Sequence, residues 1–279
     1  MGGIDLHNHT SASDGTDSPA EAVELASSLG LAAISITDHD SVSGVAEAMV
    51  AGNTLGVEVV PGIEVSSDYR DNNVHILGYF IDIRAPELRP VLDWVRTERE
   101  ERNRRITERL CADGFDISLP ELKNDYPESV LGRPHMAEMM MRKGYTRSIA
   151  EAFEKYLGEG CPYYMPKRRI SIRQAVEVIV RSGGVPVLAH PLQYHYPEPE
   201  VIEMVETARS LGVRALEAYY SEHTPEQHAW VLALAERYGL GVSGGSDYHG
   251  SRKTHIRMGS GTGGLSVPYR VLEELKTLR

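Results

Sequence analysis

The chain has 279 residues, of which 41% are hydrophobic and 25% are charged, as in ordinary globular proteins. Its formal net charge of −11 argues against an extended nucleic-acid surface, which would need an excess of Lys and Arg. No apolar run approaches the ~18 residues that a membrane span needs, and no secretory signal pattern is present, so we expect a cytoplasmic protein without membrane partners.

The stretch that opens the chain has the residue types of a metal site. Residues 2–6 are predicted to form a short strand, and His7 and His9 follow it. Because alternate residues of a strand face the same side, both imidazoles would leave the strand end together and could hold one metal ion. Asp14 lies five residues further on. Taken alone, the stretch is equally consistent with a polar loop that carries two surface histidines.

Strands and helices alternate over the first part of the chain. Ser18 and Glu21 form a capping box that predicts a helix start, and Gly30 ends that helix. The following predicted elements are strands over residues 31–36, 57–64 and 74–80 and a helix over about 42–55. Alternation at this pace predicts βαβ units that form a parallel sheet.

The alternation stops between residues 85 and 168. Arg and Glu crowd residues 96–109, which predicts a solvated helix with i, i+4 ion pairs, and residues 133–157 are expected to be helical in two pieces. We therefore expect a barrel domain over residues 1–84 and 169–279 that carries the metal site. Residues 85–168 would form a mostly helical insertion that covers the active site.

The alternation returns after this insertion. Helices are predicted over about 171–182, 199–211, 224–238 and 268–278, and strands over 185–189, 213–217 and 240–243. The barrel domain is therefore expected to be an α/β structure. We find no internal repeat that would indicate a different architecture.

Metal-ligand residue types gather at the predicted strand ends. Barrel-type α/β proteins place their chemistry at the carboxyl ends of their strands, whereas chance would put a mixture of polar residues there. The pattern therefore predicts a metal site. Its candidate ligands are His7, His9, Asp14, His39, Glu64, His190, Asp247 and His249, with His75 lying inside a strand.

The motifs that carry these residues resemble those of the PHP (polymerase and histidinol phosphatase) family of metal-dependent phosphoesterases. The similarity is closest to a stand-alone bacterial branch with a helical insertion, which includes nucleotide 3',5'-bisphosphate phosphatases and 5'-to-3' exoribonucleases. The resemblance implies a distorted (β/α)7 TIM-like barrel. The matching motifs are Asp5-Leu6-His7-Asn8-His9, Ser13-Asp14-Gly15, Ile36-Thr37-Asp38-His39-Asp40, Pro61-Gly62-Ile63-Glu64, Val74-His75-Ile76-Leu77-Gly78, Ala189-His190-Pro191 and Gly245-Ser246-Asp247-Tyr248-His249-Gly250.

The resemblance also implies a trinuclear metal centre. Glu64 would bridge two ions, and all nine expected ligand positions are present in this sequence. A degenerate, non-catalytic copy would be expected to have lost some of them. The implied sets are His7, His9, Glu64 and Asp247 for the first ion; Glu64, His75 and His190 for the second; and Asp14, His39 and His249 for the third.

The donor types point to the metal and to the reaction. Imidazole and carboxylate ligands without thiolate suit Mn²⁺, our first expectation, and also Zn²⁺ or Fe²⁺. Hydroxide bridging two such ions could attack phosphorus in line, while the metal faces neutralise the phosphate oxygens. We therefore predict hydrolysis of a phosphate ester of a small nucleotide-like substrate, such as a nucleoside 3',5'-bisphosphate, a cyclic phosphodiester or a short 5'-phosphorylated RNA.

Residues outside the ligand set are candidates for the substrate phosphate. Arg133 suits a bidentate phosphate grip, and His135 could bind the same phosphate or protonate the leaving group. A helix N-terminus with a surface Arg is the alternative. Lys167 could extend the anion site or lie in a solvated hinge. Relatives often carry an Arg where this chain has Gln193, and His195 could replace it as a donor or an acid.

The predicted roles can be stated together. The predicted catalytic residues are Asp247, His249, Arg133 and His135, and the predicted substrate contacts are Arg133, His135, Lys167 and His195. A histidinol-phosphate-type phosphatase is an alternative, and a metal-dependent amidohydrolase is a further one. A regulatory module, like the PHP segments attached to polymerases, is disfavoured by the intact ligand set. The sequence makes no prediction of the oligomeric state.

Overall fold

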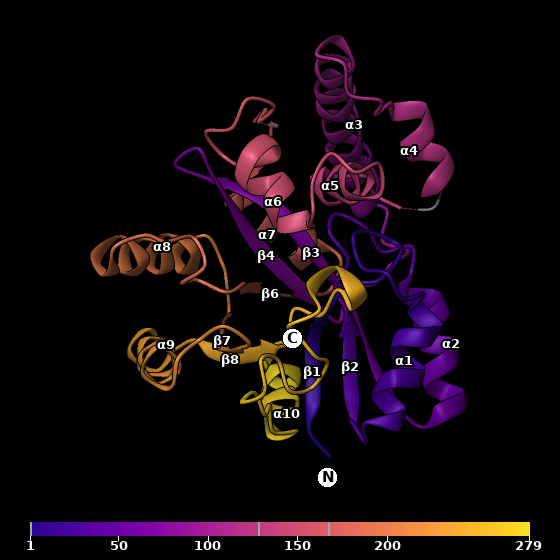
Figure 1. The fold of residues 1–279 in the computed structure, drawn as a ribbon. Helices are drawn as coiled ribbons and strands as arrows, with labels where there is room; N and C mark the ends of the chain where they lie inside the picture. Colours follow the sequence, from indigo (N-terminus) through magenta and orange to yellow (C-terminus); the bar gives the residue numbers. More distant parts are fainter. Residues whose placement is uncertain (1, 128, 167) are drawn as a thin grey trace. The chain divides into compact units, whose positions relative to one another are not determined.

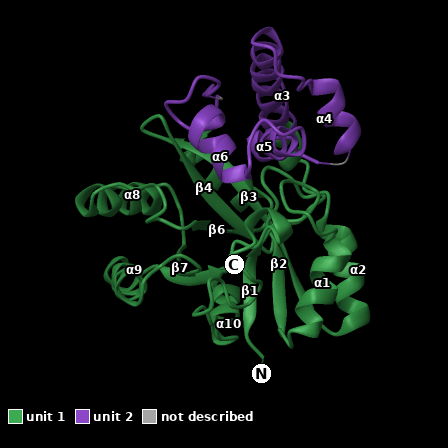
Figure 2. Ribbon diagram, in the orientation of Figure 1, with its two compact units in different colours: residues 1–92, 169–279 green, residues 93–168 purple. Residues whose placement is uncertain are grey.

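The computed structural model describes residues 2–127, 129–166 and 168–279. Its internal contacts divide the chain into two compact units (Figure 2). The barrel unit comprises residues 1–92 and 169–279, and the helical unit comprises residues 93–168. We predicted the first boundary at residues 84 and 85, whereas this division falls inside the helix that begins at Leu88. The proposal that the helical unit covers the active site stays a prediction.

The barrel unit is built on one strongly curved sheet (Figure 1). In the described part of the chain, seven strands follow one another around it in the order β1-β2-β3-β4-β6-β7-β8, and β5 pairs with β3 outside this path. The predicted distorted (β/α)7 barrel is therefore confirmed. The strands are β1 Ile4–Asn8, β2 Ala33–Ile36, β3 Glu58–Tyr69, β4 Asn72–Tyr79, β5 Ile170–Ser171, β6 Val185–Leu188, β7 Ala215–Tyr220 and β8 Gly241–Gly245.

Contacts between β1 and the end of β8 nearly close the barrel. The His9 amide donates to the Tyr248 carbonyl at 2.8 Å, and the Asp247 amide donates to the His7 carbonyl at 2.9 Å. A Cβ atom on Gly245 would lie 2.3 Å from the His7 backbone nitrogen. Only glycine therefore allows the two chain segments to approach each other this closely.

The expectation of a wholly parallel sheet is wrong for β4. This strand runs antiparallel to both β3 and β6. A tight turn joins β3 to β4, in which Arg70 and Asp71 adopt positive φ values of 51° and 66°. A parallel pair would need a crossover of a dozen or more residues, and this turn leaves no room for one. The polar sequence Arg70-Asp71-Asn72-Asn73 is a turn signal that could have indicated the hairpin.

Two candidate ligands lie inside strands rather than beyond their ends. We expected the third strand to stop at Glu64, but β3 continues to Tyr69 as one arm of the hairpin. We expected the first strand to end at residue 6, but β1 includes His7. Both corrections have the same cause, because pairing with a neighbouring strand extends each element past its polar residue.

Helices surround the strands of the barrel unit (Figure 1). The predicted capping box is present, since Ser18 and Glu21 each accept a hydrogen bond from the other's backbone. One apolar cluster, which includes Ala22, Ile34 and Ala48, joins α1 and α2 to the sheet. The helices are α1 Pro19–Ser28, α2 Val45–Leu55, α7 Ile172–Arg181, α8 Glu198–Ser210, α9 Pro225–Tyr238 and α10 Arg270–Thr277, with the 3-10 helix η2 Gly250–Lys253.

The helical unit has an apolar core of its own. Ile106, Leu110 and Met139 are fully buried members of this core. On the outer side of α3, Arg104 forms the predicted i, i+4 pair with Glu108 at 2.5 Å and also pairs with Glu101 at 2.7 Å. Among the helices of the described residues, none is long and apolar enough to cross a membrane. The elements are α3 Leu88–Ala112, α4 Leu119–Asp125, α5 Arg133–Arg142, α6 Ile149–Ala152 and the π-helix η1 Phe153–Leu157.

Candidate metal centre

Nine histidine and carboxylate side chains converge at one end of the barrel, and we call them the histidine–carboxylate cluster. Their candidate ligand atoms fall into four groups, and within each group these atoms lie within 4.8 Å of one another. The groups are His9, Asp14, His39 and His249; His7, Glu64 and His190; His7, His9 and Asp247; and His39, Glu64 and His75. All nine predicted ligands therefore appear in at least one group, and none of the groups contains a cysteine.

Glu64 lies at the centre of the cluster, and its two oxygens face different imidazoles. Oε1 is 2.8 Å from His75 Nδ1 and 3.0 Å from His190 Nε2. Oε2 is 2.9 Å from His39 Nδ1 and 3.3 Å from His9 Nε2. A carboxylate that divides its oxygens between two sets of nitrogen ligands has the geometry needed to bridge two cations.

His7 is held in one orientation by a partner outside the cluster. Its Nδ1 donates to Glu217 Oε1 at 2.8 Å, and the other oxygen of Glu217 accepts from the His190 amide at 2.8 Å. This places the proton on Nδ1 and turns the Nε2 lone pair of His7 into the cluster, 3.2 Å from His9 Nε2. A carboxylate behind a ligating histidine is the usual outer-shell partner of a metal site.

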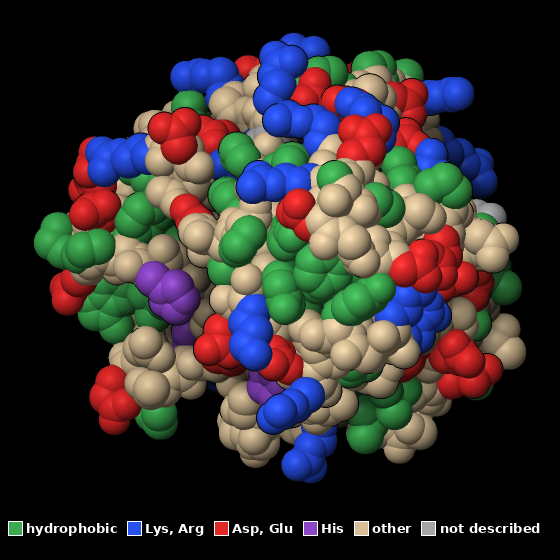
Figure 3. Space-filling model, turned by 45° about the horizontal axis from the view of Figure 1, so that its top comes forward, with side chains coloured by type: hydrophobic (Ala, Val, Ile, Leu, Met, Phe, Trp, Pro, Cys, Tyr) green, Lys and Arg blue, Asp and Glu red, His purple; other side chains and the backbone are tan. Residues whose placement is uncertain are grey.

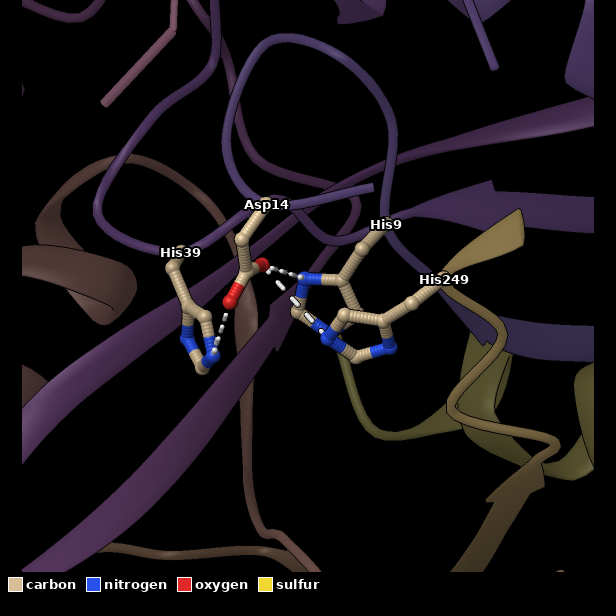
Figure 4. A group of neighbouring side chains, drawn as sticks. All are labelled: His9, Asp14, His39 and His249. Atoms are coloured by element: carbon tan, nitrogen blue, oxygen red, sulfur yellow. Dashed lines mark ion pairs between the residues drawn. The ribbon is translucent and has the colours of Figure 1, made fainter. Parts of the chain in front are cut away.

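Asp14 joins three imidazoles that come from different parts of the chain (Figure 4). Its Oδ1 lies 3.6 Å from His9 Nδ1 and 3.5 Å from His249 Nε2, and its Oδ2 lies 3.9 Å from His39 Nε2. The other ring nitrogen of His249 donates to the Asp247 carbonyl at 2.8 Å, so its Nε2 lone pair faces Asp14. This group matches the predicted third metal set with His9 added.

Asp247 presents one oxygen to the histidines and one to two side chains that our sequence analysis missed. Oδ1 lies 3.2 Å from His9 Nε2, while Oδ2 accepts from the Tyr220 hydroxyl at 2.9 Å and from Lys253 Nζ at 2.7 Å. Tyr220 ends β7 and Lys253 ends η2. Neither position has a local sequence signal, because a tyrosine or a lysine near a strand end is common in any barrel.

Two candidate ligands occupy strained backbone conformations. Asp247 has a φ of 58° and His190 has a φ of 25°, both in the positive region that residues other than glycine seldom adopt. Such a conformation costs on the order of 1–3 kcal/mol per residue and is found mainly at functional sites. The surrounding hydrogen bonds therefore hold both side chains against a local preference of the backbone.

Buried ring nitrogens in the cluster lack the hydrogen bonds that burial normally requires. Within the described part of the chain, His9 Nδ1, His39 Nδ1, His75 Nδ1, His190 Nδ1 and Glu64 Oε2 form no hydrogen bond of suitable geometry. The Nδ1 atoms of His39 and His75 lie only 2.9 Å and 2.8 Å from Glu64 oxygens, but these close contacts are not aligned as hydrogen bonds. An unsatisfied buried polar atom costs roughly 1–3 kcal/mol. Coordination to metal ions would satisfy several such lone pairs at once, so the residues present fit divalent cations.

The pKa shifts within the cluster also favour bound cations. Burial raises the pKa of Glu64, but the charges of His75, His39 and His7 outweigh burial and hold it well below its usual value. Burial lowers the pKa of His75 to about 4 despite the nearby Glu64, whereas carboxylate partners overcome burial at His9 and raise its pKa to about 9. The carboxylates are thus ionised, His75 is neutral, and the negative charge of the cluster attracts a proton to His9 when no cation is present. A bound cation would supply that positive charge in place of the proton, because a ligating imidazole must be neutral.

The predicted substrate contacts are not part of the cluster. In the helical unit, Arg133 Nη1 donates to the Leu157 carbonyl at 2.9 Å and its guanidinium stacks over Tyr164. His135 is buried and its Nδ1 accepts from the Gly132 amide at 3.1 Å. In the barrel unit, His195 is exposed on the loop after β6. Lys167 lies outside the described residues.

Charged side chains of both signs share the face of the molecule drawn in Figure 3. On the face drawn in Figure 3, acidic and basic side chains are interspersed over most of the area. Long charged side chains on α3 pair with each other, as Arg104 does with Glu101 and Glu108. Inside the cluster, the carboxylates of Glu64, Asp14 and Asp247 are buried.

Comparisons with known proteins agree with this geometry. Residues 5–184 match the PHP domain family. The chain is 34% identical to a 3',5'-nucleoside bisphosphate phosphatase from Chromobacterium violaceum, over 89% of this chain and 88% of that protein. It is 32% identical to a 5'-3' exoribonuclease from Escherichia coli, over 88% of this chain and 84% of that protein.

Solved structures extend the similarity to nearly the whole fold. A metal-dependent phosphoesterase from Bifidobacterium adolescentis superimposes with a TM-score of 0.88 at 30% identity, covering 99% of this chain and 96% of that one. A Chromobacterium violaceum protein described as an amidohydrolase, solved with bound sulfate and no metal, superimposes with a TM-score of 0.87 at 30% identity over the same shares. Both matches include the insertion as well as the barrel.

Proposed function

The chain belongs to the PHP-domain family and is a metal-dependent phosphoesterase, and from that premise we propose that its substrate is a nucleotide. The proposed reaction is hydrolysis of a phosphate ester of a nucleoside 3',5'-bisphosphate, a cyclic phosphodiester or a short 5'-phosphorylated RNA. The observation that carries this proposal is the convergence of nine imidazole and carboxylate ligands in four overlapping groups. A phosphate ester presents several oxygens to several cations, whereas an amide needs fewer.

We assign three divalent ions to the histidine–carboxylate cluster, with Mn²⁺ as the first candidate. When bound, the ions would supply a hydroxide nucleophile near neutral pH and positive charge for the phosphate oxygens. The contacts of Glu64 support a bridging role, since each of its oxygens faces a different pair of histidines. The groups around Asp14 and Asp247 would complete the ligand shells.

The chain's own residues would orient these ligands and bind the substrate. Glu217 fixes the tautomer of His7, and Tyr220 with Lys253 holds the outer oxygen of Asp247. We propose that Arg133 and His135 contact the substrate phosphate, with His135 as the candidate acid for the leaving group. Lys167 and His195 remain candidates for a second anion contact. Gln193 is uncharged and cannot replace the cationic Arg that relatives often carry at this position.

A panel of substrates tests this proposal directly. The purified chain, loaded with Mn²⁺, is expected to release phosphate or nucleotide from adenosine 3',5'-bisphosphate, a cyclic nucleotide phosphodiester or a 5'-phosphorylated RNA trimer. Turnover of histidinol phosphate alone would instead establish the histidinol-phosphatase alternative. Failure on every phosphate ester, in protein shown to hold at least two metal ions per chain, would refute the proposal.

An amidohydrolase remains the second candidate, because one structural neighbour is described by that name. The same panel therefore includes an N-acyl amino acid. Hydrolysis of this amide at a rate above that of every phosphate ester would replace the proposed function.

Gel filtration and cell fractionation would test the oligomeric state and the predicted cytoplasmic location.

A further inference from the structure

A cavity of about 310 Å³ lies in the barrel unit beside the loop that follows β6. Its lining includes Leu192, Tyr196, Glu198, Val201, Glu226 and Trp230. These residues come from the loop after His190 and from the first turns of α8 and α9. Aliphatic and aromatic side chains form most of the lining, and the two glutamates that also line it, Glu198 and Glu226, are exposed.

The cavity and the candidate metal centre are connected by one short loop. His190 is a member of the histidine–carboxylate cluster, and Leu192 of the cavity follows two residues later. Consecutive Cα atoms are about 3.8 Å apart, so the Cα atoms of these two residues are at most about 7.6 Å apart. Leu192, which forms one wall of the cavity, therefore lies close to a candidate metal ligand.

Hydrogen bonds hold this loop at both ends. The Tyr194 hydroxyl accepts from the His75 amide at 2.8 Å and donates to the Ala189 carbonyl at 3.1 Å. The Tyr196 hydroxyl donates to the Tyr69 carbonyl at 3.3 Å. The position of the cavity relative to His190 is thus fixed by the hairpin of β3 and β4.

The side chains that line the cavity favour the base of a nucleotide over its phosphate. Tyr196 and Trp230 offer aromatic faces, and Trp230 Nε1 donates to Glu198 Oε1 at 3.3 Å, which fixes the indole. Flat aromatic faces stack on any nucleobase. The carboxylates of Glu198 and Glu226 repel phosphate but accept hydrogen bonds from base amino groups.

We propose that this cavity binds the nucleobase of the substrate whose phosphate lies at the histidine–carboxylate cluster. The inference rests on the nucleotide substrate proposed above. Bases with an amino group, such as adenine and guanine, should bind better than uracil, because the uracil carbonyls would face the carboxylates of Glu198 and Glu226. Trp230 would therefore be a specificity-determining residue for the reaction.

Kinetics on paired substrates test the proposal. Trp230→Ala is expected to lower kcat/KM for adenosine 3',5'-bisphosphate by roughly 5- to 100-fold, mainly through KM. It should change kcat/KM for a base-free tetrahydrofuran 3',5'-bisphosphate less than twofold. Tyr238→Ala is the matched control, because Tyr238 packs α9 against Glu206 of α8 at the far end of the helix. An equal loss on both substrates, or no loss on either, would overturn the assignment of the cavity.

A binding measurement keeps this test separate from the test of the proposed function. The chain has two tryptophans, so Trp94→Phe leaves Trp230 as the only indole reporter. In this metal-loaded variant, adenosine and guanosine should quench the fluorescence in a saturable way, and uridine should do so more weakly. If no phosphate ester is hydrolysed yet the nucleosides still quench, the proposed function fails while the cavity assignment stands. Absence of saturable quenching would overturn the assignment whatever the activity.

Discussion

The barrel unit and the helical unit differ in the sequence separation between their polar side chains and the hydrogen-bond partners of those side chains. In the barrel, His7 reaches Glu217 across 210 residues of sequence, and Glu64 reaches His190 across 126. In the helical unit, Arg133 bonds the Leu157 carbonyl 24 residues away, and His135 bonds the amide of Gly132. The long-range contacts of the barrel bring scattered ligands to one point, whereas Arg133 joins α5 to the end of η1 and His135 stabilises the first turn of α5. The comparison indicates that the barrel alone builds the metal centre.

The largest expected effect is loss of turnover when a cluster carboxylate is removed. Asp247→Asn should reduce kcat by a factor of roughly 10³ or more, because the variant loses a charged candidate metal ligand. One oxygen of Asp247 faces His9, and the other accepts hydrogen bonds from Tyr220 and Lys253. Phosphate release from the best substrate of the panel measures it. Asp71→Asn, in the exposed β3–β4 turn, is the matched control and should keep full activity. Near-normal turnover of the Asp247 variant would contradict the assigned centre.

The two units should also respond differently to the loss of core packing. Leu110→Ala in the helical unit should cost about 2–5 kcal/mol of unfolding free energy, because Leu110 is fully buried in that unit's own core. Metal content should remain unchanged, since none of the nine candidate ligands lies in that unit. Leu272→Ala in the barrel core should lower both stability and metal retention. Thermal unfolding and metal analysis of both variants measure the difference. Metal loss from Leu110→Ala would contradict the conclusion that the barrel unit alone holds the metal ligands.

A smaller effect is expected for the substrate contact proposed for the helical unit. Arg133→Ala should lower kcat/KM by about 100-fold while leaving the metals bound, because the proposed bidentate phosphate contact would be lost. Arg142→Ala, at the other end of α5, removes an exposed pair with Asp125 and is the control. Steady-state kinetics with metal analysis distinguish the outcomes. Loss of metal from Arg133→Ala would refute its role as a substrate contact.

The smallest predicted change is in the metal affinity of the barrel unit when the carboxylate behind His7 is removed. Glu217→Gln should weaken metal affinity by about 10- to 100-fold, because the carboxylate behind His7 orients this ligand and makes it more basic. Titration of stripped protein with Mn²⁺ measures this, and excess metal should restore most of the activity. Glu236→Gln on the exposed side of α9 is the control. Unchanged affinity would leave Glu217 with a purely structural role.

The success of sequence reasoning also differs between the two units. The nine cluster residues could be found because each follows or lies in a recognisable strand, and a barrel brings strand ends together whatever the loops do. The direction of β4 could not be found in this way, since a hairpin and a crossover leave similar apolar runs. Tyr220 and Lys253 also escaped, because their contacts with Asp247 depend on loop conformation rather than on periodicity.

The insertion resisted prediction for a different reason. The motif around Arg133 is compatible with a phosphate contact, which we favoured, and with a helix N-terminus, and the structure places Arg133 at the first position of α5. A substrate contact by Arg133 depends on where the substrate lies, and the local sequence around Arg133 does not encode that position. His195 raises the same question in the barrel, where it lies exposed on a loop.

The near closure of the barrel has a consequence for the order of events in biosynthesis. Asp5 accepts from the Ser246 amide 241 residues away, and the His7 carbonyl accepts from the Asp247 amide. A nascent chain leaving the ribosome thus carries His7 and His9 long before Glu217 and Asp247 have been translated. The entropy of closing so long a loop must be overcome before the ligands meet. A metal ion that needs ligands from both ends of this sequence can therefore be held only after Asp247 has left the ribosome.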